Sequence, residues 1–179
     1  MNKDIEKVLV SEEELKEIAA RLGTQISKDY LGKNLLLVGI LRGSVVFLSD
    51  LMRNISIPCK VDFMSVSSYG DGVNSTGIVK ITQDLDINIA GYDVLIVEDI
   101  LDTGRTLTHL TELLKSRQPN SIRICTCLDK PDRRVTDLKA DYMGVQIPDE
   151  FVVGYGLDYS NLYRNLPYVG VLKPSVYGG

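Results

Sequence analysis

The sequence predicts an α/β fold in which helices flank a twisted and mostly parallel sheet. Short aliphatic runs alternate along the chain with segments of helical period. The runs at 35–41 and 94–97 are apolar throughout, as is typical of strands that are covered on both faces. Strands that alternate with helices in this way are joined by right-handed crossovers, so their sheet is mostly parallel.

The first expected element is an amphipathic helix. The stretch SEEE at 11–14 has the pattern of a capping box, and apolar residues follow at positions 15, 18, 19 and 22, which share one helix face. The later elements follow in chain order. They are a strand at 35–41, a turn at 42–44, a helix at 45–53, a strand at 60–66 with both faces partly apolar, short strands at 78–81 and 85–89, a strand at 94–97, a helix at 106–117, and strands at 122–128, 142–147 and 151–153.

Two segments depart from this alternation. The stretch YGDGVNSTG at 69–77 holds three glycines and has no apolar period, so a mobile loop is expected there. The last ~30 residues carry Gly154, Gly156, Pro167 and Gly170, which favour turns, and five tyrosines. They are expected to form a small hood over one edge of the sheet together with the other terminal segment. Residues 1–179 are therefore expected to be a single domain, with 148–179 in the hood.

Composition excludes several classes of protein. A net charge of −4 and a pI near 5.0 argue against nucleic-acid and anionic-membrane partners, which need a basic surface. No apolar run is long enough to span a bilayer, and the first residues have no apolar signal core. Three cysteines, Cys59, Cys125 and Cys127, make no disulfide framework, and the last two would face one side of a strand as packing residues. A cytoplasmic protein is expected.

The stretch VLIVEDILDTGRTL at 94–107 places Glu98, Asp99 and Asp102 directly after a buried strand. In an open parallel sheet, ligands bind beyond the carboxyl ends of the strands. The turn at 102–106 then opens a helix, whose free N–H groups and dipole favour a phosphate. Carboxylates bind sugar hydroxyls or Mg²⁺ instead. Together these groups predict a phosphorylated sugar as the ligand.

Competing interpretations of this stretch fail on spacing. The chain has neither G-x-x-x-x-G-K-[ST] nor G-x-G-x-x-G, so nucleotide loops of those types are absent. A phosphoacceptor receiver domain carries its acid pair on the first strand, whereas here the pair comes on about the fifth. A solvated acidic helix cap does not explain two acids that precede the cap position.

The stretch resembles the phosphoribosyl-pyrophosphate (PRPP) motif of type I phosphoribosyltransferases, in which two acids after a strand precede D-T-G-x-T. Within that superfamily the chain is similar to the bacterial-type hypoxanthine-guanine phosphoribosyltransferases over nearly its full length. The other segments that carry the resemblance are LRGS at 41–44, SY at 68–69 with STG at 75–77, LDKPDRR at 128–134 and FVVGYGLDY at 151–159.

The resemblance implies a type I phosphoribosyltransferase fold and transfer of a phosphoribosyl group from PRPP to N9 of a purine, with Mg²⁺ as cofactor. It implies Glu98, Asp99 and Asp158 as metal ligands and Asp102 as the catalytic group over purine N7. It also implies a cis peptide bond at Leu41–Arg42. The PRPP-binding residues that it implies are Arg42, Gly43, Glu98, Asp99, Asp102, Thr103, Gly104, Arg105, Thr106 and Arg164.

For the purine, the resemblance implies that Phe151 stacks on the base, Lys130 donates to its 6-oxo group, and Val152 and Asp158 lie beside it. Ser68 and Tyr69 are implied to belong to a lid that excludes water. The substrates would be PRPP with hypoxanthine or guanine, and the chain would form a homo-oligomer, a tetramer or a dimer. The base preference, any use of xanthine, and proton transfer by Asp102 stay open.

One alternative from another class remains, a PRPP-binding regulator on the same fold that binds RNA. Asp102 discriminates between the two, because regulators that resemble this motif usually lack an acid at that position. The block FVVGYGLDY at 151–159 and the low pI also favour the enzyme.

Overall fold

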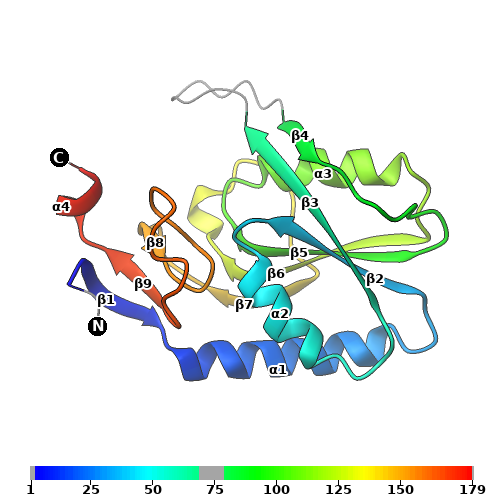
Figure 1. Cartoon of the computed structure of the whole chain (residues 1–179), viewed down its shortest axis with the longest axis horizontal. Coiled ribbons are helices and arrows are strands. Elements are labelled where there is room, and N and C mark those ends of the chain that lie inside the picture. The colour runs from blue at the N-terminus through cyan, green and yellow to red at the C-terminus, as the bar shows by residue number, and fades with distance from the viewer. Residues whose placement is uncertain (1–2, 69–78, 179) are drawn as a thin grey trace.

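The structure is a computed structural model that describes residues 3–68 and 79–178 (Figure 1). Its elements, in chain order, are β1 (Ile5–Val10), α1 (Glu12–Asp29), β2 (Leu35–Leu41), α2 (Val45–Arg53), β3 (Lys60–Ser68), β4 (Val79–Gln83), β5 (Asp93–Leu101), α3 (Arg105–Lys115), β6 (Ser121–Asp129), a 3₁₀ turn (Pro131–Arg133), β7 (Tyr142–Gln146), β8 (Val152–Val153), β9 (Val169–Leu172) and α4 (Pro174–Tyr177).

The central sheet has the strand order β4-β3-β2-β5-β6-β7. Its neighbouring strands pair in parallel, except for the antiparallel pair of β3 and β4 at one edge. The predicted mostly parallel sheet is therefore confirmed. Because β2 and β5 lie side by side in the middle, the segments that follow them meet at one edge of the sheet.

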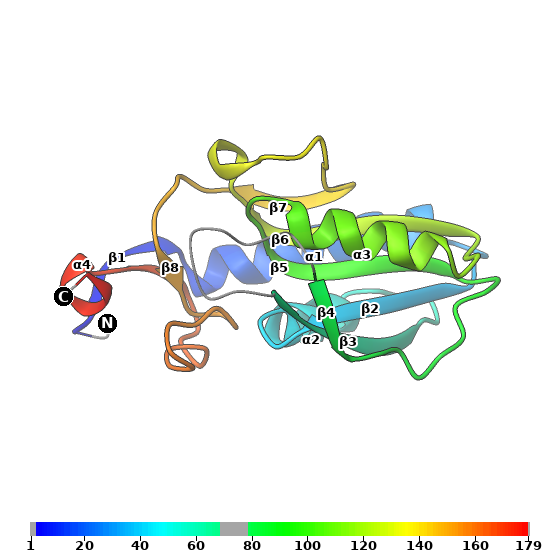
Figure 2. The same cartoon turned by 90° about the horizontal axis from the view of Figure 1, so that it is seen from above.

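Helices cover both faces of this sheet (Figures 1 and 2). On one face, α1 and α2 pack against alternate residues of β2, β5 and β6. On the other face, α3 packs against the intervening residues of β2 and β5. Burial on both faces explains why β2 and the stretch 94–97 of β5 are apolar throughout.

The helix α1 begins as the capping box predicts. The Ser11 hydroxyl accepts a hydrogen bond from the Glu14 N–H at 3.2 Å, and the Glu14 carboxylate accepts one from the Ser11 N–H at 2.8 Å. These two bonds satisfy donors that a helix end leaves unpaired. The apolar face that follows, including Leu15 and Leu22, is buried against the sheet.

A second, three-stranded sheet forms the hood from both ends of the chain. Its order is β1-β9-β8, with antiparallel pairing throughout, and Figures 1 and 2 show β1, β9 and α4 at the same end of the molecule. The predicted hood from the terminal segments is present. The sequence did not indicate β1 or β9 as strands, because each is completed only by its partner from the other end of the chain.

The expected strand at 85–89 is wrong. The Leu85 N–H donates to the Asp84 carboxylate at 2.7 Å, and the Ile87 N–H donates to the Asp62 carboxylate at 2.8 Å. Since side-chain oxygens satisfy this backbone, it does not pair with a strand. Leu85 and Ile87 still pack on the core beneath α3.

The expected loop at 69–77 and its lid residue Tyr69 lie outside the described residues, as does the first residue of the strand expected at 78–81. The described strand there is β4, which pairs with β3. Within the described ranges, the chain contains no helix with the length and apolar character needed to cross a membrane.

The cysteines belong to the packing of the protein. Cys125 and Cys127 are buried free thiols on β6, on the face covered by α1 and α2. Burial raises the pKa of both thiols well above the ordinary range. Cys59 is only half-buried, and burial raises its pKa as well.

This difference in burial predicts the order of thiol labelling. At pH 8 the native chain should react with a thiol reagent at Cys59 while Cys125 and Cys127 stay protected, because only thiolates react and these two side chains are inaccessible. Mass spectrometry of the labelled chain, before and after unfolding in urea, measures this. Labelling of Cys125 at the rate of Cys59 in the native chain would contradict the packing.

Candidate active site

The acidic residues are held on the end of β5, not beyond it. The strand predicted at 94–97 continues to Leu101, because Glu98 pairs with Thr126 and Ile100 pairs with Leu128 on β6. Glu98 and Asp99 therefore sit on a rigid strand in the middle of the sheet. Their backbone is fixed by a neighbouring strand, so their side chains are aimed by the sheet itself.

A cavity of about 360 Å³ opens at this edge of the sheet. It brings together seven of the predicted site residues from four separate segments. These residues are Arg42, Gly43, Glu98, Asp99, Thr106, Asp158 and Arg164.

Gly43 is required by a close approach in this cavity. A Cβ at position 43 would overlap the Asp99 carboxylate, so only glycine allows the backbone after β2 to lie against that side chain. The hood reaches the same point, since a Cβ on Gly156 would overlap the Gly43 carbonyl oxygen. The peptide bond between Leu41 and Arg42 is cis, as the sequence resemblance implied.

The cations of the cavity come from two directions. Arg42 follows β2, and Arg164 projects from the hood segment. Arg164 donates to the Gly156 carbonyl oxygen at 2.6 Å and forms an ion pair with Asp158 at 2.7 Å. Asp158 also accepts a hydrogen bond from the Asn161 N–H at 2.8 Å. This arrangement places a cation opposite the acids of β5.

Burial and mutual repulsion shape the electrostatics of the two acids. Burial, followed by the charge of Asp99, raises the pKa of Glu98 well above its usual value. Burial raises the pKa of Asp99 to about 6, although hydrogen bonding to the Ile100 N–H and the charge of Arg164 act in the opposite direction. A cation or a set of hydroxyl donors at this point would favour the charged forms.

The donor set suits Mg²⁺ bound together with a substrate. The described residues contain no cluster of three or more acid, histidine or cysteine side chains that could enclose a metal ion on their own. Mg²⁺ usually binds through one or two carboxylates, with waters and substrate phosphates completing its shell. Glu98, Asp99 and Asp158 line one cavity and fit that mode of binding.

A second, smaller cavity of about 170 Å³ adjoins the first and shares Glu98, Asp99 and Thr106 with it. Asp102, Thr103 and Gly104 form its remaining polar wall. Gly104 caps α3 in a left-handed conformation, with φ at +84°, and the helix N-terminus follows directly. The turn that was predicted to bind phosphate thus lies beside the acid pair, at the N-terminus of α3. Arg105 begins α3, and its side chain is exposed.

The remaining predicted residues lie beside these two cavities. Lys130 is buried, and its ammonium donates to the Glu150 carbonyl oxygen at 2.6 Å, directly before Phe151. Burial lowers the pKa of Lys130, while Asp102 and Asp149 raise it. An ammonium has three donors, so Lys130 keeps hydrogen-bonding capacity for a further acceptor.

Phe151 is 39% exposed and is held by other aromatic rings. It stacks on Tyr177 at a centroid distance of 4.7 Å and meets Tyr159 edge-on at 5.7 Å. Val152 is buried and pairs with Val171 in the hood. Of the predicted lid, Ser68 is the last residue of β3, and Tyr69 lies outside the described part of the chain.

Two residues near Asp102 were missed by the sequence analysis. The Arg133 side chain lies 3.2 Å from the Asp102 carboxylate and 3.6 Å from that of Asp149. Arg134 bonds to the Asp102 backbone carbonyl oxygen at 2.9 Å. Both stand in the block LDKPDRR, and a pair of adjacent arginines directly after an internal strand was the available signal.

The comparisons with known proteins agree with this geometry. The sequence profile of the phosphoribosyl transferase domain matches residues 9–160. The chain is 57% identical over 177 residues to the hypoxanthine-guanine phosphoribosyltransferase of Staphylococcus aureus (strain Mu50 / ATCC 700699), covering 99% of each chain.

Two solved structures extend the similarity to the fold. The tetragonal crystal structure of a hypoxanthine phosphoribosyltransferase from Staphylococcus aureus matches with a TM-score of 0.97 and 56% identity, covering 100% of this chain and 97% of the other. The hypoxanthine phosphoribosyl transferase of Trypanosoma cruzi matches with a TM-score of 0.95 and 39% identity, covering 99% and 96%.

The raised pKa values predict that Glu98→Gln stabilises the ligand-free chain. Between about pH 4 and pH 6 the folded chain holds protons on these carboxyl groups that the unfolded chain has released, so the free energy of unfolding falls as the pH rises. Removing one of the two like charges should raise the free energy of unfolding by on the order of 1 kcal/mol at pH 8, and by less at pH 5.

Urea unfolding of the wild type and the variant at both pH values measures this effect. Glu112→Gln, which neutralises an exposed acid on α3, is the matched control and should change the free energy of unfolding little at either pH. Equal unfolding free energies for the wild type and Glu98→Gln at pH 8 would contradict a repelling pair.

Proposed function

Since the chain belongs to the phosphoribosyl transferase family, we propose that it transfers the 5-phosphoribosyl group from PRPP to N9 of hypoxanthine or guanine. The products are IMP or GMP and pyrophosphate, which makes the chain a transferase of purine salvage. The observation that best supports this function is the pair of adjoining cavities, which are lined by an acid pair, two arginines and the N-terminus of α3.

The sugar and its phosphate occupy the two cavities. Glu98 and Asp99 hold the ribose hydroxyls, because carboxylates accept hydrogen bonds from them while repelling phosphate. The turn at 102–106 holds the 5′-phosphate through its N–H groups and the hydroxyls of Thr103 and Thr106. The Gly104 backbone gives close access to the anion, and the backbone of Arg105 belongs to the same turn.

The pyrophosphate lies in the larger cavity. Arg42, Gly43 and Arg164 line this cavity, and the two arginines supply cations. Glu98, Asp99 and Asp158 would hold Mg²⁺ there. With PRPP bound, the metal ion would supply positive charge against the negative charge of the leaving pyrophosphate.

The purine lies between Phe151 and the end of β5. Phe151 stacks on the base, Lys130 donates to its 6-oxo oxygen, and the Val152 backbone and Asp158 bond its edge. Support for this placement comes from the contact between the Lys130 ammonium and the carbonyl oxygen that precedes Phe151. Asp102 faces N7, where it either takes a proton as N9 attacks or orients the base by a hydrogen bond.

A lid that contains Ser68 and Tyr69 keeps water from the activated sugar.

Residues 1–179 form one domain, which acts in the cytoplasm as a homo-oligomer, either a tetramer or a dimer. For the Trypanosoma cruzi relative, the published structure concerns the role of the C-terminal region in the oligomeric state and enzymatic activity. No observation favours the RNA-binding regulator, and the relatives reported above are transferases.

Nucleotide formation from PRPP with hypoxanthine, guanine, xanthine and adenine, measured side by side, tests the function and the role of Lys130. Lys130→Ala should lower the ratio of kcat/KM for hypoxanthine to that for adenine by about 10–100-fold, because a charged donor to the 6-oxo oxygen is lost. The KM for PRPP should change far less. Lys115→Ala, an exposed lysine on α3, is the matched control. Unchanged discrimination in Lys130→Ala would reject this role.

The three acids of the motif should separate by role. Glu98→Gln and Asp99→Asn should weaken PRPP binding and shift its Mg²⁺ dependence. Asp102→Asn should leave PRPP binding largely intact and lower kcat by ~10²–10⁴ if Asp102 accepts the proton, or by much less if it only orients N7. Turnover and PRPP affinity at fixed Mg²⁺ measure this. Equal losses of PRPP affinity in all three variants would place Asp102 with the sugar acids.

A further inference from the structure

Three successive carbonyl groups of the phosphate-binding turn are held from behind by one segment. The Leu101 carbonyl oxygen accepts hydrogen bonds from the Lys130 N–H and from Arg134, both at 3.0 Å. The Asp102 carbonyl oxygen accepts one from Arg134 at 2.9 Å. The Thr103 carbonyl oxygen accepts one from the Val135 N–H at 3.0 Å.

This pattern fixes the direction of the amides that face the ligand. In a trans peptide the N–H group points opposite to the carbonyl group of the same unit. Holding the carbonyls of Leu101, Asp102 and Thr103 toward the segment at 130–135 therefore turns the next three N–H groups away from it. The segment also packs on Gly104, where an added Cβ would overlap the Thr136 hydroxyl.

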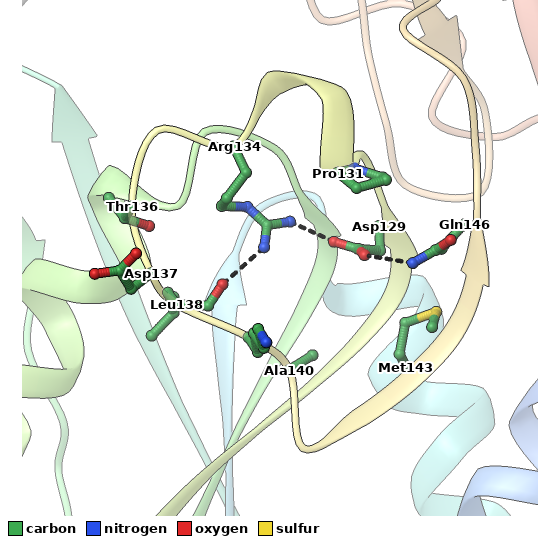
Figure 3. A pocket seen from close by; sticks show the side chains of 10 residues that line it. Asp129, Pro131, Arg134, Thr136, Asp137, Leu138, Ala140, Met143 and Gln146 are labelled. Atoms are coloured by element: carbon green, nitrogen blue, oxygen red, sulfur yellow. Dashed lines mark hydrogen bonds and ion pairs between the residues drawn. The ribbon is translucent and has the colours of Figure 1, made fainter.

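Arg134 anchors this arrangement to the sheet (Figure 3). Its side chain is 14% exposed and pairs with Asp129, the last residue of β6, whose side chain is 13% exposed. Gln146 on β7 lies 3.5 Å from the other oxygen of Asp129. A further nitrogen of Arg134 donates to the Leu138 carbonyl oxygen at 2.8 Å. One guanidinium thus links β6, the phosphate-binding turn and the loop before β7.

We propose that Arg134 is a positioning residue for phosphoribosyl transfer, acting through the backbone at 101–103 without touching substrate. This inference rests on the function proposed above. A guanidinium presents its donors in a rigid planar fork, whereas an ammonium is a single point of charge on a flexible stem. Only the fork can bond at once to Leu101, Asp102, Leu138 and Asp129. Lysine at this position would keep the ion pair with Asp129 and lose the hold on the carbonyl groups.

The surroundings of Arg134 make a chemical rescue possible. A cavity of about 660 Å³ lies against its side chain and is lined in part by Asp129, Met143 and Gln146 (Figure 3). Truncation to alanine would extend this cavity to the carbonyl oxygens of Leu101 and Asp102. A free guanidinium ion entering there can restore the lost donors, while urea has a similar planar shape but carries no charge to pair with Asp129.

The experiment compares Arg134→Lys, Arg134→Ala and the control Lys139→Ala, which removes an exposed cation on the rim of the same cavity. Both Arg134 variants should lose about 10²-fold in kcat/KM for PRPP, since small displacements of binding groups have effects of this size. The KM for hypoxanthine should change by less than about threefold, because Lys130 and Phe151 contact the base. Lys139→Ala should match the wild type.

In Arg134→Ala, guanidinium at tens of millimolar should raise kcat/KM about tenfold, which recovers part of the loss. Urea at the same concentration should not raise it, and neither compound should stimulate the wild type. Full activity in Arg134→Lys, or no rescue of Arg134→Ala in a chain that unfolds at the wild-type urea concentration, would overturn the inference. A wild-type chain that forms no nucleotide would reject the proposed function itself, whereas an active wild type with fully active variants would reject only the role of Arg134.

Discussion

The carboxylates of Glu98 and Asp99, adjacent and half-buried at the end of β5, are the constraint on which the rest of the site depends. Burial raises the pKa of both groups, and the charge of Asp99 raises that of Glu98 further, so the folded chain disfavours the doubly ionised pair. The sheet compels this arrangement, because β5 stays hydrogen-bonded to β6 through these residues. A ligand that brings a divalent cation and hydroxyl donors would relieve the repulsion, which couples the stability of the apoprotein to substrate binding.

The parts that surround the acid pair come from distant segments, and small residues allow them to meet. Gly43 admits the Asp99 carboxylate, and Gly156 admits the Gly43 carbonyl group, so the turn after β2, the end of β5 and the hood are in contact at one point. Arg164 ties the hood to this contact through the Gly156 carbonyl oxygen. The hood is itself closed by strands from both ends of the chain. A displacement of β1 or β9 would therefore be transmitted to the contact between Gly43 and Gly156.

The sequence predicted correctly those features that depend on interactions between residues close together in the chain. The capping box before α1, the apolar runs of β2 and β5, and the acids before the turn at 102–106 are each contained in one short stretch, and the helix and strands formed as expected. Most of the errors lie where residues distant in the sequence determine the structure. At 85–89 the carboxylate of the distant Asp62, together with that of the adjacent Asp84, replaced a strand partner, and β1 exists because β9 pairs with it. The roles of Arg133 and Arg134 were invisible for the same reason, since they act on backbone and side chains some 30 positions earlier.

The two sides of the turn proposed to bind phosphate have different surroundings. One side faces the smaller cavity, which Asp102, Thr103 and Gly104 line. The other side is bonded to the segment at 130–135, which begins where β6 ends. Lys130 belongs to that same segment, so the donor proposed for the purine and the support of the sugar phosphate are fixed to one end of one strand. The pairing of β5 with β6 sets the distance between these two parts of the chain. If they bind the purine and the phosphate as proposed, the separation of the two subsites is therefore determined by the sheet.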